Sequence, residues 1–367
     1  MKIERSLLLT RLPQRSEAAL QHRRRLLFAL GAGQLAAGLT GGLAARLTIG
    51  LAGALTSGIA AHAQSNAPPA RIGFVVASRT AGNAARLAAF KQGMREIGLI
   101  EGKHYVLDPV YAEGRYERFP ALIKELLQRE PAVIVTTTIT SVRAAQQATR
   151  TVPIVMAGTN DPVGSGLVAS LARPGGNTTG LSTQGEDTAA KLVEFVREAL
   201  PRAKRIALLI NPDNPSHAKL GGQVRTAASK FGIEAPTFET PTPAAFDAAF
   251  AAITKGRHDA LVTLRDAMLN AEHQRISEFA LKNRIAAFGP DVEFAESGSF
   301  LSYGASATDM SRRSATYVKK ILAGAKPADL PVEQPIKFEM VLNQKTAKAL
   351  GIKIPYALLI QAERVIE

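Results

Sequence analysis

The chain contains no cysteine and no tryptophan among its 367 residues. Without cysteine there can be no disulfide, thiolate metal site, cysteine nucleophile or cysteine for lipid attachment. Phenylalanine and tyrosine are also scarce, so leucine, isoleucine, valine and alanine must fill the core. Such a composition suits a parallel sheet whose central strands are buried on both faces. The length allows two domains, each with its own core.

Several motifs of enzymes and cofactor-binding proteins are also missing. The sequence has neither a P-loop nor a G-x-S-x-G nucleophile elbow. Residues 164–169 match G-x-G-x-x-A, but a dinucleotide-binding turn follows the first strand of its unit, and this stretch follows the fourth expected strand. We therefore expect no catalytic residue and no cofactor.

The histidines that follow the N-terminal region show no metal-ligand spacing. They are dispersed along the chain in polar contexts: His104, His217, His258 and His273. Because metal sites draw on clustered ligands, we expect all four histidines at the surface and no metal site.

The N-terminal region has the parts of an export signal. Arginines at 23–25 precede an uncharged run at 26–45, and Ala61-His62-Ala63 forms an A-x-A cleavage site. We expect a signal peptide over residues 1–63, cleavage before Gln64 and a flexible leader over 64–70. The paired arginines leave the Sec and twin-arginine routes both open. An uncleaved membrane anchor is the alternative, because twenty uncharged residues can span a bilayer.

The positive charge is spread along the chain. The formal net charge is +14, and residues 1–63 carry eight Lys/Arg and two Asp/Glu, which leaves 37 basic and 29 acidic residues and a net charge of +8. These basic residues stand singly rather than in patches interleaved with aromatics, so we expect a solvated surface and no nucleic-acid partner.

The rest of the chain repeats one pattern about 134 residues apart. RIGFVV at 71–76 and RIALLI at 205–210 each begin a succession of strand, helix, strand, helix and strand. This order predicts an α/β fold of two Rossmann-like lobes, each with a parallel sheet, joined by several crossings that form a hinge. We expect lobe one over 71–182 plus 303–327, lobe two over 183–302, and a C-terminal segment over 328–367 packed on the lobes near the hinge.

Small polar residues follow the expected strands. They occur at 78–80, 136–141 and 158–162 in the first half and at 211–214, 265–266 and 290–291 in the second half. Ligands of parallel α/β sheets bind at these carboxyl ends, where backbone N–H groups are free. Each residue could instead serve as an ordinary helix N-cap.

Five stretches together resemble the periplasmic substrate-binding proteins of ABC transporters, of the tryptophan- and tyrosine-binding type. They cover 90–105, 111–122, 160–182, 302–309 and 328–355, and the most distinctive is DPVGSGLVASLARPGGNTTG within the third. The resemblance implies a fold like that of type I periplasmic binding proteins. It also implies a periplasmic monomer that binds a small solute between its lobes and delivers it to an inner-membrane ABC permease.

The resemblance also implies which residues bind the solute: Ser78, Thr137, Thr138 and Asp161 from lobe one, Asn211, Asn214 and Asp266 from lobe two, and Tyr303. Hydroxyl and backbone N–H groups suit a ligand carboxylate, and Asp161 or Asp266 suits an ammonium group. The segment after the first strand, ASRTAGNAAR, lacks aromatics that would stack on an aromatic amino acid. Two alternatives remain, a ligand-binding sensory protein for a membrane receptor and an enzyme that uses the same cleft.

Overall fold

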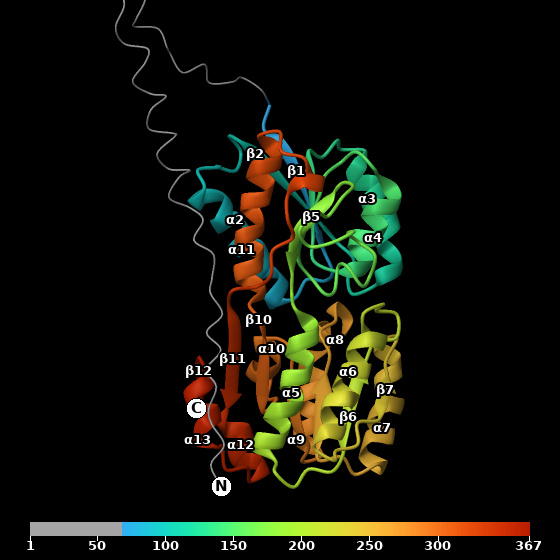
Figure 1. The fold of residues 1–367 in the computed structure, drawn as a ribbon, viewed down its shortest axis with the longest axis vertical. Helices are drawn as coiled ribbons and strands as arrows, with labels where there is room; N and C mark the ends of the chain where they lie inside the picture. Colours follow the sequence, from blue (N-terminus) through green and yellow to red (C-terminus); the bar gives the residue numbers. More distant parts are fainter. Residues whose placement is uncertain (1–67) are drawn as a thin grey trace, which may run out of the picture. The chain divides into compact units, whose positions relative to one another are not determined.

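The computed structural model describes residues 68–367 (Figure 1). The expected signal peptide and residues 64–67 of the expected leader lie outside this range. Within residues 68–367, no helix combines the length and apolar character needed to cross a membrane.

The first sheet is wholly parallel, with strand order β2-β1-β3-β4-β5. All five strands were expected from the sequence; four of them are largely buried, and the edge strand β2 is half-buried. They are β1 (Ala70–Val76), β2 (Tyr105–Tyr111), β3 (Val133–Thr136), β4 (Ile154–Thr159) and β5 (Thr178–Ser182). Helices cover both faces, as the parallel arrangement requires.

Two pairs of helices cover the first sheet. On one face α2 (Ala81–Glu96) packs beside α11 (Ala307–Leu322), and Phe90 and Val318 belong to the same buried cluster. On the other face α3 (Phe119–Leu127) packs beside α4 (Ile139–Ala148). A one-turn 3₁₀ helix, η1 (Tyr116–Arg118), leads into α3. We call this sheet with these helices lobe one.

The second sheet has the order β12-β11-β10-β9-β8-β6-β7. Its strands are β6 (Ile206–Ile210), β7 (Thr237–Glu239), β8 (Ala260–Thr263), β9 (Ala286–Gly289), β10 (Leu301–Ala305), β11 (Phe338–Asn343) and β12 (Arg364–Ile366). Only the β10–β11 pair is antiparallel among these strands. The chain reaches β11 from α11 in lobe one rather than through a crossover helix of its own lobe, so this strand can run opposite to its neighbour.

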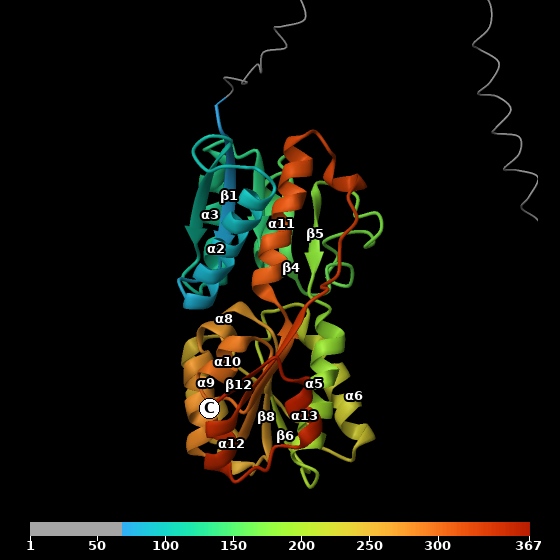
Figure 2. The ribbon, with the colours of Figure 1, turned by 90° about the vertical axis from the view of Figure 1, so that its left-hand side faces the viewer.

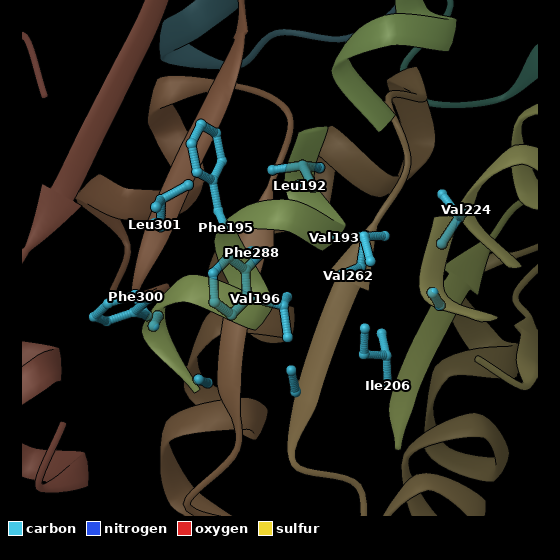
Figure 3. Packing of buried hydrophobic residues seen from close by; sticks show 14 of the residues in the cluster. Leu192, Val193, Phe195, Val196, Ile206, Val224, Val262, Phe288, Phe300 and Leu301 are labelled. Atoms are coloured by element: carbon cyan, nitrogen blue, oxygen red, sulfur yellow. The ribbon is translucent and has the colours of Figure 1, made fainter. Parts of the chain in front are cut away.

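Helices also cover both faces of the second sheet, and we call this unit lobe two. One face carries α5 (Gly185–Ala199) and α6 (His217–Lys230), whose apolar side chains pack on the strands around Val262 and Phe288 (Figure 3). The other face carries α7 (Phe246–Lys255), α8 (Ala267–Ala271), α9 (His273–Lys282) and α10 (Val292–Glu296). The chain ends with α12 (Gln344–Leu350), α13 (Tyr356–Gln361) and β12, and η2 (Pro243–Ala245) precedes α7.

The chain passes between the lobes three times, after β5, after β10 and after α11 (Figure 2). On its last passage, past η3 (Pro327–Asp329), it runs beside β5, where the Ser182 amide donates to the carbonyl of Glu333 at 2.8 Å. The predicted α/β fold with two lobes is confirmed, and the predicted parallel arrangement holds in both sheets except for the β10–β11 pair. β10 runs to Ala305 in the second sheet, and β11 and β12 extend that same sheet.

Candidate functional site

A polar cavity lies between the carboxyl ends of the two sheets. Its volume is about 60 Å³. Lobe one supplies the ends of β1, β3 and β4, and the first turns of α2 and α4. Lobe two supplies the ends of β6 and β8, and parts of α8, α9 and α10. This is the position at which parallel α/β sheets bind ligands.

In lobe one, short local hydrogen bonds hold the cavity wall at the end of β1. The Asn83 amide nitrogen donates to the Ser78 carbonyl at 2.9 Å and to its hydroxyl at 3.1 Å. Thr80 caps α2 by accepting from the Asn83 backbone N–H at 3.3 Å. Because these side chains fix one another, the donors and acceptors of this wall are preorganised for a ligand.

At the end of β3 the wall is the N-terminus of α4. Thr138 accepts from the Ser141 backbone N–H at 3.1 Å, and the Ser141 side chain completes a capping box. Thr137, Thr138 and Thr140 line the cavity. Helix N-termini attract anionic groups through their free N–H groups and the helix dipole.

In lobe two the most extensively hydrogen-bonded group is the Asp266 carboxylate, which is 4% exposed. It caps α8 by accepting from the backbone N–H groups of Met268 and Leu269 at 2.9 and 3.1 Å. The side chains of Asn211 and Asn214 donate to it at 3.2 and 2.9 Å. Together with a bond from Tyr116 of lobe one, five hydrogen bonds hold this carboxylate in place.

The lobes touch through Tyr116. Its hydroxyl, from lobe one, donates to Asp266 Oδ2 at 2.7 Å and accepts from the Ala267 backbone N–H at 3.1 Å. Burial, followed by the negative charge of Asp266, raises the pKa of Tyr116 well above its usual range. Tyr116 therefore stays protonated and serves as a permanent donor to lobe two.

A second bridge between the lobes centres on Asp291. Arg265 Nη1 lies 2.5 Å from its carboxylate, and Arg86 of lobe one lies 3.7 Å away. Arg265 also donates to the carbonyls of Pro290 and Ala305 at 2.9 and 3.0 Å. Burial lowers the pKa of Arg265, and the charge of Asp291 opposes that shift.

Glu293 lines the same part of the cavity. Burial first, and then the neighbouring Asp291, raise the pKa of its carboxyl. An alanine in place of Gly82 would put its Cβ 1.9 Å from a Glu293 oxygen, so this side chain lies directly against the start of α2.

The prediction that all four histidines lie at the surface is wrong for His217 and His258, which are 1% and 7% exposed. His217 Nδ1 accepts from the Asn211 backbone N–H at 2.9 Å, so Nε2 carries the proton and donates to the Arg265 carbonyl at 3.1 Å. Burial lowers the pKa of His217, which keeps the ring neutral. The histidine thus ties together the ends of β6 and β8, a tertiary role that its polar sequence neighbours did not indicate.

Five of the predicted ligand-binding residues line the cavity: Ser78, Thr137, Thr138, Asn214 and Asp266. Asn211 is buried behind the wall and holds Asp266. Asp161 Oδ1 accepts from the Gly164 backbone N–H at 2.9 Å, and its Oδ2 pairs with Lys219 of lobe two at 3.0 Å. Tyr303, on β10, packs against Phe195 and Phe338, with ring centroids 5.1 and 5.9 Å away.

Further cavity residues were not among those predicted: Asn83, Arg86, Tyr116, Asn160, Arg265, Asn270, His273 and Glu293. The sequence indicated two of them, because Asn160 and Arg265 follow the same strands as Asp161 and Asp266. Asn160 donates to the Arg265 carbonyl at 3.2 Å. The others reach the cavity from helices, where no strand-end rule applies. Across residues 68–367 no group of three or more His, Asp or Glu is arranged to hold a metal ion.

A two-lobed α/β fold with a polar cavity between its sheets is suited to binding a small ligand between two domains. The family described as ABC transporter substrate binding protein matches residues 75–366, and the chain belongs to that family.

Several proteins of known structure or name are similar to this chain. The tyrosine-binding protein of Clostridioides difficile (strain R20291) is 24% identical over 264 residues, which cover 72% of this chain and 76% of that protein. The ABC domain of Streptococcus pneumonia, solved in complex with L-Trp, has a TM-score of 0.76 and 24% identity, covering 81% of this chain and 100% of that one. A conserved domain protein of Vibrio cholerae O1 biovar El Tor has a TM-score of 0.76 and 28% identity, covering 81% and 99%. These similarities agree with the resemblance found in the sequence.

Proposed function

We propose that this protein captures a small solute between its lobes and delivers it to the inner-membrane permease of an ABC import system. The observation that carries the proposal is the cavity at the facing strand ends, because both lobes contribute polar groups to it. Hydrogen bonds across the cavity, such as Tyr116 to Asp266, favour a closed arrangement. Movement about the three connections would open the cavity to solute.

The proposal assigns chemical roles to the two walls. The N-terminus of α4 and the hydroxyls of Ser78, Thr137 and Thr138 suit an anionic group such as a carboxylate. Asp266 suits an ammonium group, and Asn214 holds it in position. Asp161 does not line the cavity, so the ammonium role falls to Asp266, and Asp161 pairs with Lys219 instead. None of these roles requires a bond to be broken, and the proposal includes no catalysis.

The site of action completes the proposal. A signal peptide over residues 1–63 would direct the chain to the periplasm, where the protein would act as a monomer without nucleic acid. The test is to express the whole chain, recover the periplasmic fraction and determine the N-terminus of the product. A product that begins at Gln64 supports the proposal, whereas a full-length product in the membrane fraction contradicts it.

Solute binding is tested on the same purified product. Unfolding and refolding removes any retained solute, and thermal unfolding is then followed against a panel of amino acids, purines, sugars and organic acids. A solute at about one hundred times its dissociation constant adds roughly 2.7 kcal/mol of stability. That gain corresponds to a shift of about 4 °C in the unfolding midpoint of a chain of this length. If no compound shifts the midpoint, solute capture is refuted; a shift accompanied by conversion of the compound would favour the enzyme alternative.

A further inference from the structure

Glu293 is a carboxylate at the boundary between the lobes. It belongs to α10 of lobe two, and its Oε1 lies directly against Gly82 in the first turn of α2 of lobe one, because a Cβ on Gly82 would lie 1.9 Å from that oxygen. The side chain is only partly exposed, and it lines both the cavity and an adjoining groove of about 560 Å³. Separation of the lobes would hydrate this carboxylate, and closure removes water from it.

Glu293 has no ion-pair partner of its own within residues 68–367. The two arginines that act on it both pair with Asp291 instead, Arg86 at 3.7 Å and Arg265 at 2.5 Å. Asp291 is itself a carboxylate, 6% exposed, and stands two residues before Glu293. Burial first, and then Asp291, raise the pKa of Glu293, and the two arginines only partly offset that shift.

Other ionisable side chains share the cavity or the groove with Glu293: Asp266, His273, Glu296, Glu339, Glu363 and Arg364. Five hydrogen bonds hold Asp266, and Glu296 pairs with Arg364 at 2.5 Å within lobe two. The first turn of α2 attracts negative charge, but its Asn83 N–H is taken by Thr80. Burial lowers the pKa of His273, so protonation of that ring in acid would favour an open form, the opposite response to that of Glu293.

We propose that closure of the lobes takes up a proton at Glu293, so that a fall in pH favours the closed form and strengthens the hold on the solute. In the open form water surrounds the carboxylate, whereas in the closed form lobe one displaces that water and Asp291 stands beside it. The resulting stabilisation of the closed form is complete below the pKa of the open form and is lost as the pH rises through the raised pKa of the closed form. The inference rests on the proposed function and adds a dependence on pH to closure.

Small-angle X-ray scattering of the solute-free protein at pH 8 and pH 5 tests this linkage without a known solute. The sample is the refolded product of the thermal experiment. The unmodified protein should be more compact at pH 5 than at pH 8. Glu293→Gln, which keeps the shape of the protonated side chain at every pH, should be as compact at pH 8 as the unmodified protein is at pH 5.

The opposite results are equally clear. Identical scattering of the unmodified protein at the two pH values overturns the inference. Expansion in acid also overturns it and would point to His273. A Glu293→Gln variant that responds to pH as the unmodified protein does shows that another group titrates.

The matched control is Glu296→Gln. It removes the same charge from the same helix, but Glu296 is exposed and pairs with Arg364 of its own lobe. This variant should keep the pH response of the unmodified protein. The unfolding midpoint of each variant at pH 8 shows whether it is folded; if Glu293→Gln is not, Glu293→Met removes the same charge with a side chain of similar length and should give the same result.

Affinity provides a second measurement. Titration calorimetry with L-tyrosine and L-tryptophan, at pH 8 and pH 5, gives the dissociation constant of each probe. For a probe that binds, the constant should be about threefold or more lower at pH 5, and Glu293→Gln should bind at pH 8 as tightly as the unmodified protein does at pH 5. Constants within about twofold of each other at the two pH values overturn the inference. If neither probe binds, the scattering alone decides it, and solute capture is decided separately by the thermal panel.

Discussion

Replacing Tyr116 by phenylalanine tests whether the bond between the lobes controls solute affinity. The change removes a 2.7 Å hydrogen bond to the Asp266 carboxylate and leaves the ring packing against Phe119 in place. Asp266 keeps its bonds to Asn211, Asn214 and the start of α8, so lobe two should remain folded. The substitution should therefore destabilise the closed form of the protein and leave the separate lobes folded.

The magnitude follows from the charge on the acceptor. A hydrogen bond to a charged group contributes about 1.5–3 kcal/mol. If closure and binding are coupled, Tyr116→Phe should raise the dissociation constant by roughly 10- to 150-fold. Titration calorimetry gives the affinity, and small-angle X-ray scattering without solute should show a more open average shape.

The matched control is Tyr356→Phe, because Tyr356 is 78% exposed and lies outside the cavity. It should leave both affinity and shape unchanged. If Tyr116→Phe binds solute within twofold of the unmodified protein and scatters identically, the bond between the lobes does not control closure and the reasoning fails.

Three further predictions follow from single contacts. Burial lowers the folded-state pKa of His217, so the stability that the neutral ring contributes should be complete above the unfolded pKa of about 6.5 and should decline as the pH falls below it. The free energy of unfolding measured with urea between pH 8 and 5 should therefore fall less steeply in His217→Gln than in the unmodified protein. Gly180→Ala should lower the free energy of unfolding by roughly 2–6 kcal/mol, because φ is +133° and a Cβ would lie 2.2 Å from the Met156 carbonyl oxygen. The control Gly98→Ala, also at positive φ but with open space around it, should lower it by only about 1–2 kcal/mol. Equal losses of stability in the two variants would refute the steric account. Lys219→Gln removes the ion pair with Asp161 and should weaken solute binding less than about fivefold, because the Lys219 side chain is half exposed. This effect should vanish in 1 M salt. A larger loss of affinity that persists in salt would show that the contact with Asp161 is more than a surface ion pair.

The sequence predicted the architecture well because each buried strand is a short apolar run. The repeat around residues 71–76 and 205–210 becomes β1 and β6, each of which is the second strand from one edge of its sheet. The direction of β11 could not be predicted in this way. Nothing in the residues of a single strand states the direction of its neighbour, so the antiparallel β10–β11 pair could be seen only in the structure.

The cavity was predicted in part, and the residues explain why. Ser78, Thr137 and Asp266 lie within three residues of a strand end, and the strand-end rule finds such positions. Tyr303 lies within a strand, and packing against Phe195 places its ring with the core rather than in the cavity. Tyr116 and Arg86 reach the cavity from η1 and α2, and only the tertiary fold determines which helical residues face the other lobe.

The order of elements along the chain also affects how the protein can acquire its structure. Lobe one lacks α11 until residue 322 has been synthesised, and lobe two lacks β12 until residue 366. Neither lobe can therefore be completed before the other has begun to be synthesised, unlike the domains of a chain in which one domain simply follows another. Nearly the whole polypeptide must leave the ribosome before the last element of either lobe is available, because these elements end at residues 322 and 366.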